Sequence, residues 1–288
     1  MAVEPDKTAW QRAVLGQSGA RVILEERDHR VIVRKISPDS RGAAQQDKQE
    51  RAATWSSHVS IPRVLDPWDG HSFTMEYVAG EPLGEFLRFA SLAECSDVVG
   101  ALTGFIEDNW GTNHDPALQA ALSEKVAELR TRIRPGEDLA HRALAALDRS
   151  IPGLVIPGGE NHGDLSFENV IITPGTPHAW LIDFLDSPLD SPLNGVGRFL
   201  RLASRAWGMA ARRPPAAEML GGRALGTAMR ALCNRQDVLA DAIAAFKLLA
   251  AARILPYSRN PFRIAVLHDV FLTELPRLTP AASRCSRR

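Results

Sequence analysis

His162-Gly-Asp-Leu-Ser-Phe-Glu-Asn169 is the stretch that decides the fold of this chain, and Asp183 follows it by fourteen residues. Asp164 is an acid that can orient an acceptor hydroxyl, while Asn169 and Asp183 offer oxygen ligands for magnesium. Phosphoryl transfer needs such a set, because the metal neutralises the triphosphate while the acid directs the attacking group. The five-residue gap lets Asp164 face the acceptor while Asn169 turns toward the metal. The stretch therefore predicts the catalytic edge of a kinase.

Two short apolar runs frame the position of Asp183. Residues 170–172 (Val-Ile-Ile) and 180–182 (Trp-Leu-Ile) are separated by Thr-Pro-Gly-Thr-Pro, a turn-rich connection typical of a hairpin. A lone His-x-Asp would also suit a capped turn with a solvated carboxylate. The order of loop, strand, turn, strand and metal ligand favours the kinase interpretation.

These motifs resemble those of the aminoglycoside phosphotransferase and choline kinase group of small-molecule kinases. The resemblance rests on His162-Gly-Asp164, on Asn169, and on Ile182-Asp-Phe184. Protein kinases instead carry His-Arg-Asp and Asp-Phe-Gly, so the Gly163 and Leu185 of this chain point away from protein substrates. The longer string at residues 181–188 also resembles phosphotransferases associated with bacterial surface polysaccharides.

The resemblance implies a role for each matching residue. Asp164 would be the catalytic acid that steers the acceptor proton, and Asn169 and Asp183 would hold Mg²⁺. His162 would brace the loop rather than act as a base. The implied activity is transfer of the γ-phosphate of ATP, or of GTP, to a hydroxyl of a small molecule.

The rest of the chain predicts an α+β, bilobal protein kinase-like fold. Strands are expected at residues 20–36, as a hairpin, and at residues 61–66 and 72–78, with one helix at residues 45–55. After a break at residues 79–84, the long segments are helical. We therefore expect a nucleotide-binding lobe with a small antiparallel sheet at residues 1–79. Residues 80–288 would form a larger, mainly helical lobe for catalysis and acceptor binding.

Lys35 is the expected phosphate ligand. It ends Val31-Ile-Val-Arg-Lys35, which resembles the kinase strand whose lysine contacts the α and β phosphates. Alternation puts Lys35 on the same strand face as Val33, which could cover an adenine, and Arg34 on the other face. Arg34 is the alternative, and a surface strand ending in two solvated cations would explain the pattern without a nucleotide.

A lysine in such a cleft needs a carboxylate from the next helix. Asp47 and Glu50 both qualify, because they lie three residues apart on one helical face, and Glu50 is favoured for its longer reach.

Two backbone segments complete the expected nucleotide site. Gly16, Ser18 and Gly19 form a short match to a glycine-rich phosphate loop, although an ordinary turn would look the same. Glu76 and Val78 lie in Met75-Glu-Tyr-Val78, which is similar to a hinge that binds adenine through its backbone. An ordinary edge strand, with side chains that alternate between buried and exposed, would have the same pattern.

Composition limits the class of protein. The chain has 288 residues, 45% of them hydrophobic and 24% charged, as expected of a globular protein. No basic and apolar leader opens the sequence and no run is long enough to span a bilayer, so we expect a cytoplasmic protein without a membrane partner. Three cysteines without Cys-x-x-Cys spacing argue against a disulfide framework and a zinc site.

The charge is uneven along the chain. After Phe184 it has sixteen Lys and Arg against seven Asp and Glu, while the whole chain is neutral. This excess favours a neutral or anionic acceptor, such as a sugar or sugar phosphate, over a cationic aminoglycoside. Arg198, Arg201 and Arg205 share a predicted helix face that could bind an anion, or that could simply be an exposed basic edge.

Asp186 and Asp190 could face the acceptor, although Asp-Ser-Pro is also a common turn or helix cap. An aminoglycoside-modifying kinase and an inactive kinase-like nucleotide-binding module remain the alternatives. Binding of nucleic acid is not expected, because the arginines are dispersed and no aromatic-interleaved basic motif occurs. The sequence does not indicate the oligomeric state.

Overall fold

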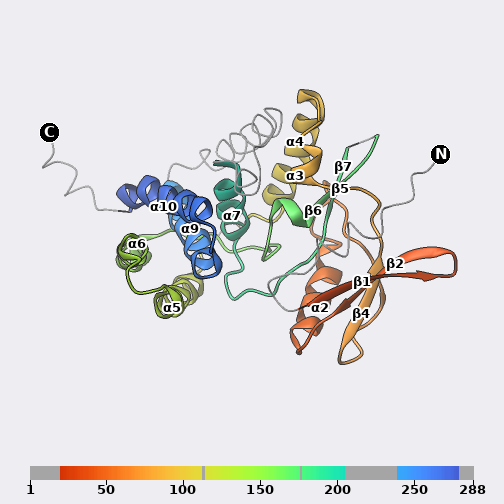
Figure 1. The fold of residues 1–288 in the computed structure, drawn as a ribbon, viewed down its shortest axis with the longest axis horizontal. Coiled ribbons are helices and arrows are strands. Elements are labelled where there is room, and N and C mark those ends of the chain that lie inside the picture. The colour runs from red at the N-terminus through yellow and green to blue at the C-terminus, as the bar shows by residue number, and fades with distance from the viewer. Residues whose placement is uncertain (1–19, 112–113, 176, 205–238, 279–288) are drawn as a thin grey trace, which may run out of the picture.

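The computed structural model describes residues 20–111, 114–175, 177–204 and 239–278. A four-stranded antiparallel sheet forms the amino-terminal lobe, at the right of Figure 1. Its strands are β1 (Arg21–Arg27), β2 (Arg30–Ile36), β3 (Val64–Asp66) and β4 (Ser72–Glu76), in the order β1-β2-β4-β3. Asp28 and His29 join β1 to β2 with φ values of 50° and 60°, the left-handed geometry that suits a tight hairpin turn.

Helix α2 (Arg41–Ala52) follows β2 and packs against β3 and β4. It begins four residues before the expected start at residue 45, and it ends before residue 55. Its apolar side chains are all alanines, so its buried face is mostly polar. The buried residues are Gly42, Gln45, Gln46, Lys48, Gln49 and Ala52.

A second, three-stranded antiparallel sheet begins the larger lobe. It consists of β5 (Glu81–Pro82), β6 (Val170–Thr173) and β7 (His178–Leu181). The β6–β7 pair confirms the hairpin expected around residues 173–177. Ser60 also bonds to β7, donating to Ala179 and accepting from Leu181 at 2.9 Å each. The chain before β3 therefore contacts the second sheet, and the lobe division after residue 79 stays a prediction.

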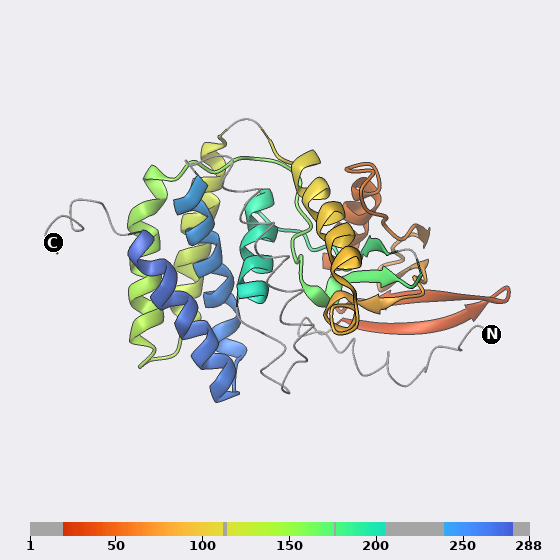
Figure 2. The ribbon, with the colours of Figure 1, turned by 90° about the horizontal axis from the view of Figure 1, so that it is seen from above.

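Helices make up most of the larger lobe (Figures 1 and 2). They are α3 (Leu83–Phe86), α4 (Leu92–Asp108), α5 (Pro116–Arg132), α6 (Asp138–Ser150), α7 (Pro192–Ser204), α9 (Ala240–Ile254) and α10 (Pro261–Glu274). Short 3₁₀ turns occur at residues 151–153, 167–169 (η2), 255–257 and 275–277. Side-chain caps at Ser91, Asp115 and Asn260 start α4, α5 and α10 by accepting orphan backbone N–H groups.

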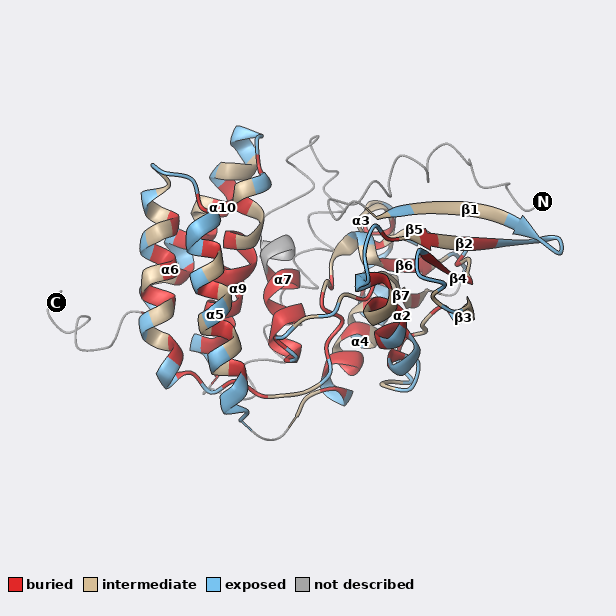
Figure 3. Ribbon diagram, turned by 90° about the horizontal axis from the view of Figure 1, so that it is seen from below, coloured by how far each residue is buried: buried red, intermediate tan, exposed pale blue. Residues whose placement is uncertain are grey.

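Helix α9 is the centre of the helical lobe. Every residue from Ala242 to Ala252 is buried, and the helix contacts α5, α6, α7 and α10. Much of α9 is accordingly coloured as buried in Figure 3. A helix that is apolar on all sides must be surrounded by other elements. The small antiparallel sheet lobe and the larger helical lobe confirm the expected α+β class. None of the helices in the described ranges is both long and apolar enough to cross a membrane.

Candidate active site

The loop predicted to be catalytic turns sharply at Gly163, where φ is +80°. A Cβ at this position would lie 1.9 Å from the carbonyl oxygen of Leu185, so the backbone can approach this closely only at glycine. The Leu185 N–H donates to the His162 carbonyl at 3.0 Å. The loop and the segment after Asp183 are therefore held side by side.

Asp164 lies beside two nitrogen donors. Asn169 donates from Nδ2 to the Asp164 carbonyl oxygen at 2.9 Å and to its carboxylate at 3.4 Å. The guanidinium of Arg198, a buried residue of α7, contacts the same carboxylate. The Asp164 side chain is still 35% exposed, so an acceptor hydroxyl could reach it. The structure thus brings Asp164 and Asn169 together and adds Arg198, which the sequence indicated only through its helical spacing.

Asp183 follows β7 and has φ +62°, a left-handed conformation that few non-glycine residues adopt. The N–H of Ile182 donates to the Asn169 carbonyl at 3.0 Å, which holds the two expected metal ligands on adjacent segments. The Asp183 carboxylate contacts Nζ of Lys35. The structure therefore joins a residue of β2 to the predicted metal ligand of the other lobe.

Lys35 is the cation of β2 that faces the site. Only 5% of it is exposed, and on the same strand face Val33 packs with Phe73 and Met75. Arg34 points to the other face, where it donates to the Glu25 carboxylate at 2.6 and 3.0 Å. Of the two cations, Lys35 is therefore the one that contacts Asp183, and its role as a phosphate ligand stays a prediction.

The expected pairing of Lys35 with Glu50 is not formed. Glu50 and Asp47 are both exposed, and Glu50 accepts a hydrogen bond from Gln46 at 3.1 Å. The two acids do share a helix face, but α2 packs with the opposite face toward the protein. Lys35 is instead neutralised by Asp183.

A cation of α2, Lys48, points inward where an acid was expected. Its Nζ lies 3.0 Å from Oδ1 of Asp190, which also accepts from Asn161 Nδ2 at 2.7 Å. Asn161 in turn accepts the Gly163 N–H at 2.6 Å. These bonds link α2 to the candidate catalytic loop. Neither Lys48 nor Asn161 was expected at the site. For Lys48 the sequence did hold a signal, because a helix without large apolar residues must bury a polar face.

The other predicted nucleotide contacts fall on two segments, of which the structure describes the one at the end of β4. Glu76 ends β4, and its carboxylate accepts from the backbone and side chain of Arg63 at 3.2 and 3.1 Å. Val78 is buried just after that strand. Gly16, Ser18 and Gly19 lie outside the described residues, as does Arg205.

His162 is buried against Phe184, with 4.2 Å between the ring centroids. Burial lowers its pKa to about 4, and the nearby Asp183 only partly opposes this. The imidazole is therefore neutral at pH 7. Its Nδ1 accepts the Asp164 N–H at 3.3 Å, as expected of a residue that braces the loop.

The donor set fits magnesium better than a softer metal. Mg²⁺ prefers oxygen ligands, and it commonly binds one or two protein groups together with phosphate oxygens. Asp183 supplies a carboxylate, and the Asn169 amide nitrogen is used by Asp164, which leaves the amide oxygen for a metal. No group of three or more His, Cys, Asp or Glu that could hold a metal occurs within the described ranges.

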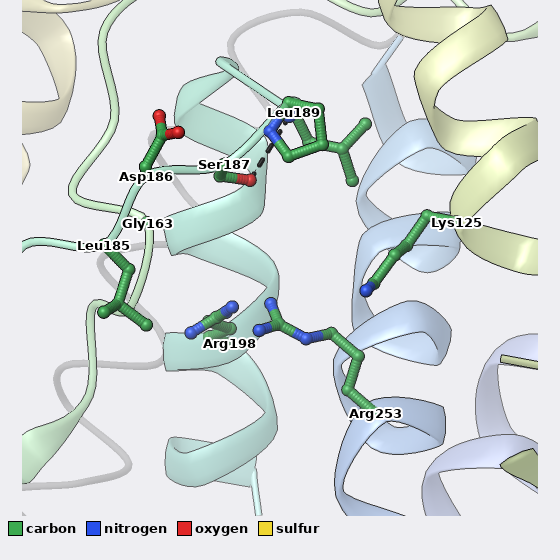
Figure 4. A pocket seen from close by; sticks show the side chains of 9 residues that line it. Lys125, Gly163, Leu185, Asp186, Ser187, Leu189, Arg198 and Arg253 are labelled. Atoms are coloured by element: carbon green, nitrogen blue, oxygen red, sulfur yellow. Dashed lines mark hydrogen bonds between the residues drawn. The ribbon is translucent and has the colours of Figure 1, made fainter. Parts of the chain in front are cut away.

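A cavity of about 90 Å³ lies beside this loop (Figure 4). It is lined by Gly163, by residues 185–189 and by three cations, Lys125, Arg198 and Arg253. The cations come from α5, α7 and α9 respectively. We call this space the basic cavity.

Comparison with known proteins gives one family and a common fold. A family model described as "Phosphotransferase enzyme family" matches residues 10–234, whereas no curated protein matches significantly. A thermostable mutant of the aminoglycoside phosphotransferase APH(4)-Ia, in a ternary complex with AMP-PNP and hygromycin B, is 16% identical with a TM-score of 0.58 over 91% of both chains.

Two further solved structures are similar. A candidate fructosamine-3-kinase from Thermobifida fusca is 17% identical with a TM-score of 0.53, over 96% of this chain and 100% of that one. An ethanolamine kinase from Plasmodium vivax is 11% identical with a TM-score of 0.52, over 94% and 82%. These likenesses confirm the kinase-like fold.

Proposed function

Because the chain belongs to the phosphotransferase enzyme family, we propose that it transfers the γ-phosphate of ATP to a hydroxyl of a small molecule, a sugar or sugar-like metabolite. The observation that carries this proposal is the contact of Lys35 with Asp183, beside Asp164 and Asn169. A buried cation, a carboxylate, an amide oxygen and an acid thus converge where two lobes meet. This arrangement suits positioning and charge neutralisation, the main needs of phosphoryl transfer.

Each residue has a distinct task in the proposed reaction. Phosphate oxygens entering between Lys35 and Asp183 would bind the ammonium of Lys35. Asn169 and Asp183 would hold Mg²⁺, which supplies charge neutralisation of the phosphates when bound. Asp164 would orient the acceptor hydroxyl and accept its proton as the oxygen attacks in line. Neutral His162 would keep the loop in register through the Asp164 N–H.

The charges near Asp164 support a neutral or anionic acceptor over a cationic one. Arg198 contacts the carboxylate of Asp164, and two further cations line the basic cavity. A polycationic aminoglycoside would be repelled there. An inactive nucleotide-binding module is the weaker candidate, since Lys35, Asp164, Asn169 and Asp183 are all present. A cytoplasmic location and the choice of ATP over GTP also stay proposals.

The test is to measure Mg²⁺-dependent nucleotide binding and acceptor-dependent ADP release across sugars, sugar phosphates, amino alcohols and aminoglycosides. Asp183→Ala should lose nucleotide binding and turnover together, because it removes a metal ligand. Asp164→Ala should bind nucleotide normally while its turnover falls by about 10²–10⁴-fold. Lys35→Met should weaken the binding of ATP more than that of the acceptor.

Asp97→Ala is the matched control, because Asp97 is an exposed acid on α4 and takes no part in the contacts described for the site. It should leave both activities unchanged. If wild-type protein binds no magnesium nucleotide, or if Asp183→Ala binds it equally well, the proposed function is wrong. Nucleotide binding without turnover on any acceptor would favour the binding-module alternative.

A further inference from the structure

Among the residues that the structure describes, one cation of the basic cavity has no hydrogen-bond or ion-pair partner. Lys125 pairs with Glu128 at 2.5 Å, and Arg198 pairs with Asp164. Arg253 has neither a hydrogen bond nor an ion pair in the part of the chain that the structure describes. A partly buried guanidinium normally finds a carboxylate, because removal from water is costly.

Glu128 is the carboxylate that acts most strongly on Arg253, but both of its oxygens already contact other cations. One of its oxygens lies 2.5 Å from Lys125 and the other 2.5 Å from Arg132. Burial lowers the pKa of the Arg253 guanidinium and Glu128 raises it only in part. The charge of Arg253 is therefore only partly balanced by Glu128, and an anion in the cavity would complete that balance.

The geometry of the cavity gives that counter-charge a place. Arg198 and Arg253 point toward one another across the cavity, whereas the Asp186 side chain points away from both (Figure 4). Arg198 already pairs with Asp164, so an anion bound in the cavity would chiefly meet the charge of Arg253. Guanidinium groups bind phosphate and carboxylate well, because their N–H groups match the spacing of the oxygens.

We infer that the basic cavity binds an oxyanion, a phosphate or carboxylate carried by the acceptor, with Arg253 as a direct ligand. The inference rests on the proposed function and names the substrate class of that site: acceptors that carry both a hydroxyl and an anionic group. Arg198 touches both the cavity and the Asp164 carboxylate. An anionic group held there would place the rest of the acceptor beside the acid that orients its hydroxyl.

The experiment compares acceptors that differ in charge, with the full chain saturated with Mg²⁺ and nucleotide. Glucose 6-phosphate and glucuronate are the anionic probes, glucose the neutral one and glucosamine the cationic one. Dissociation constants come from calorimetry with MgADP, and KM values from ADP release with MgATP. Inorganic phosphate with MgADP is the smallest anionic probe.

Arg253→Gln should lower the affinity for the anionic probes by about tenfold or more, the scale of a lost charge-assisted hydrogen bond. The same substitution should change the affinity for glucose by less than about twofold. Arg259→Gln is the matched control, because it removes the same charge from an exposed position soon after α9. It should leave every value unchanged, and thermal unfolding of both variants shows whether they are folded.

Several outcomes would overturn the inference. The inference is wrong if wild-type protein binds no anionic probe, or if it binds glucose or glucosamine as tightly as the anions. It is also wrong if Arg253→Gln leaves the affinity for the anions unchanged. Failure of the proposed function is a different result, namely no magnesium nucleotide binding. A kinase that prefers neutral or cationic acceptors would keep that function and contradict only the assignment of the cavity.

Discussion

Gly163 sets the geometry of the candidate catalytic loop through two independent constraints. Its φ of +80° disfavours side chains, and a Cβ would overlap the Leu185 carbonyl. We expect Gly163→Ala to lower the free energy of unfolding by about 3 kcal/mol or more, the sum of a left-handed penalty and overpacking. Urea unfolding measures this loss.

Gly175 is subject to only one of these two constraints, the left-handed backbone conformation. It has φ +89°, but nothing among the described residues lies within 4 Å of the position that a Cβ would take. Gly175→Ala should therefore cost only about 1–2 kcal/mol, the left-handed penalty alone. Equal losses in the two variants would show that the approach to Leu185 does not matter.

Burial of His162 makes stability depend on pH. Its pKa falls from 6.5 to about 4 in the folded protein. Above pH 6.5 the His162 imidazole is neutral in both the folded and the unfolded protein. As the pH falls toward 4, the unfolded chain takes up the proton first. The free energy of unfolding should then drop by about 3 kcal/mol, at 1.36 kcal/mol per pKa unit.

The measurement is urea unfolding of wild-type protein and His162→Gln at pH 7 and pH 4.5. The variant starts from a lower stability but should lose less on acidification. His71→Gln, a change at an exposed histidine, should follow the wild-type curve. Parallel curves for wild type and His162→Gln would contradict a buried neutral imidazole.

The proximity of the candidate catalytic residues could be predicted from sequence, because the set is nearly local. Asp164, Asn169 and Asp183 lie within twenty residues, joined by one hairpin whose turn residues are recognisable. Strand alternation likewise distinguished Lys35 from Arg34. The contact of Arg198 with Asp164 could not be predicted, because spacing on a helix gives the face of a residue but not the partner opposite it.

At the scale of elements, α2 shows why one interpretation failed. Asp47 and Glu50 share a face, as predicted, but helix periodicity alone does not say which face turns inward. Apolar residues normally decide this, and here only alanines are available. The inward face is instead chosen by Gln49, which donates to the Pro62 carbonyl at 2.8 Å, and by Lys48.

Helices α9 and α10 are joined by a buried ion pair between Lys247 and Glu274. Glu274 is 1% exposed and Lys247 8% exposed. Lys247→Met should lower the free energy of unfolding by about 3–5 kcal/mol, because among the described residues it leaves the buried Glu274 carboxylate with the more distant Arg277 alone. Adding Glu274→Leu should restore much of this loss, and urea unfolding measures both.

The same substitution at Lys125 is the control. Its pair with Glu128 joins residues three apart on α5, where both side chains are partly exposed. Lys125→Met should cost no more than about 1 kcal/mol. A similar loss at both positions, or no recovery in the double variant, would mean that burial of the Lys247 pair is not what stabilises α9 against α10.

On the scale of the whole molecule, Lys48 and Asp190 connect the two lobes. The Lys48 side chain is 2% exposed, while that of Asp190 is 53% exposed. This asymmetry predicts unequal single variants. Asp190→Ala leaves a buried ammonium without its partner and should cost about 2–4 kcal/mol, whereas Lys48→Met leaves a carboxylate that water can solvate and should cost about 1 kcal/mol.

The double variant completes the cycle. Without the ammonium, loss of Asp190 removes only its bond to Asn161, so Lys48→Met/Asp190→Ala should be more stable than Asp190→Ala alone. Turnover should fall in the two variants that lack Asp190, because the bond from Asn161 to Asp190 helps to hold the residue that accepts the Gly163 N–H of the candidate catalytic loop. Urea unfolding and turnover rates measure the two effects. Additive losses of stability would show that Lys48 and Asp190 act independently, and unchanged turnover would show that this link does not position the loop.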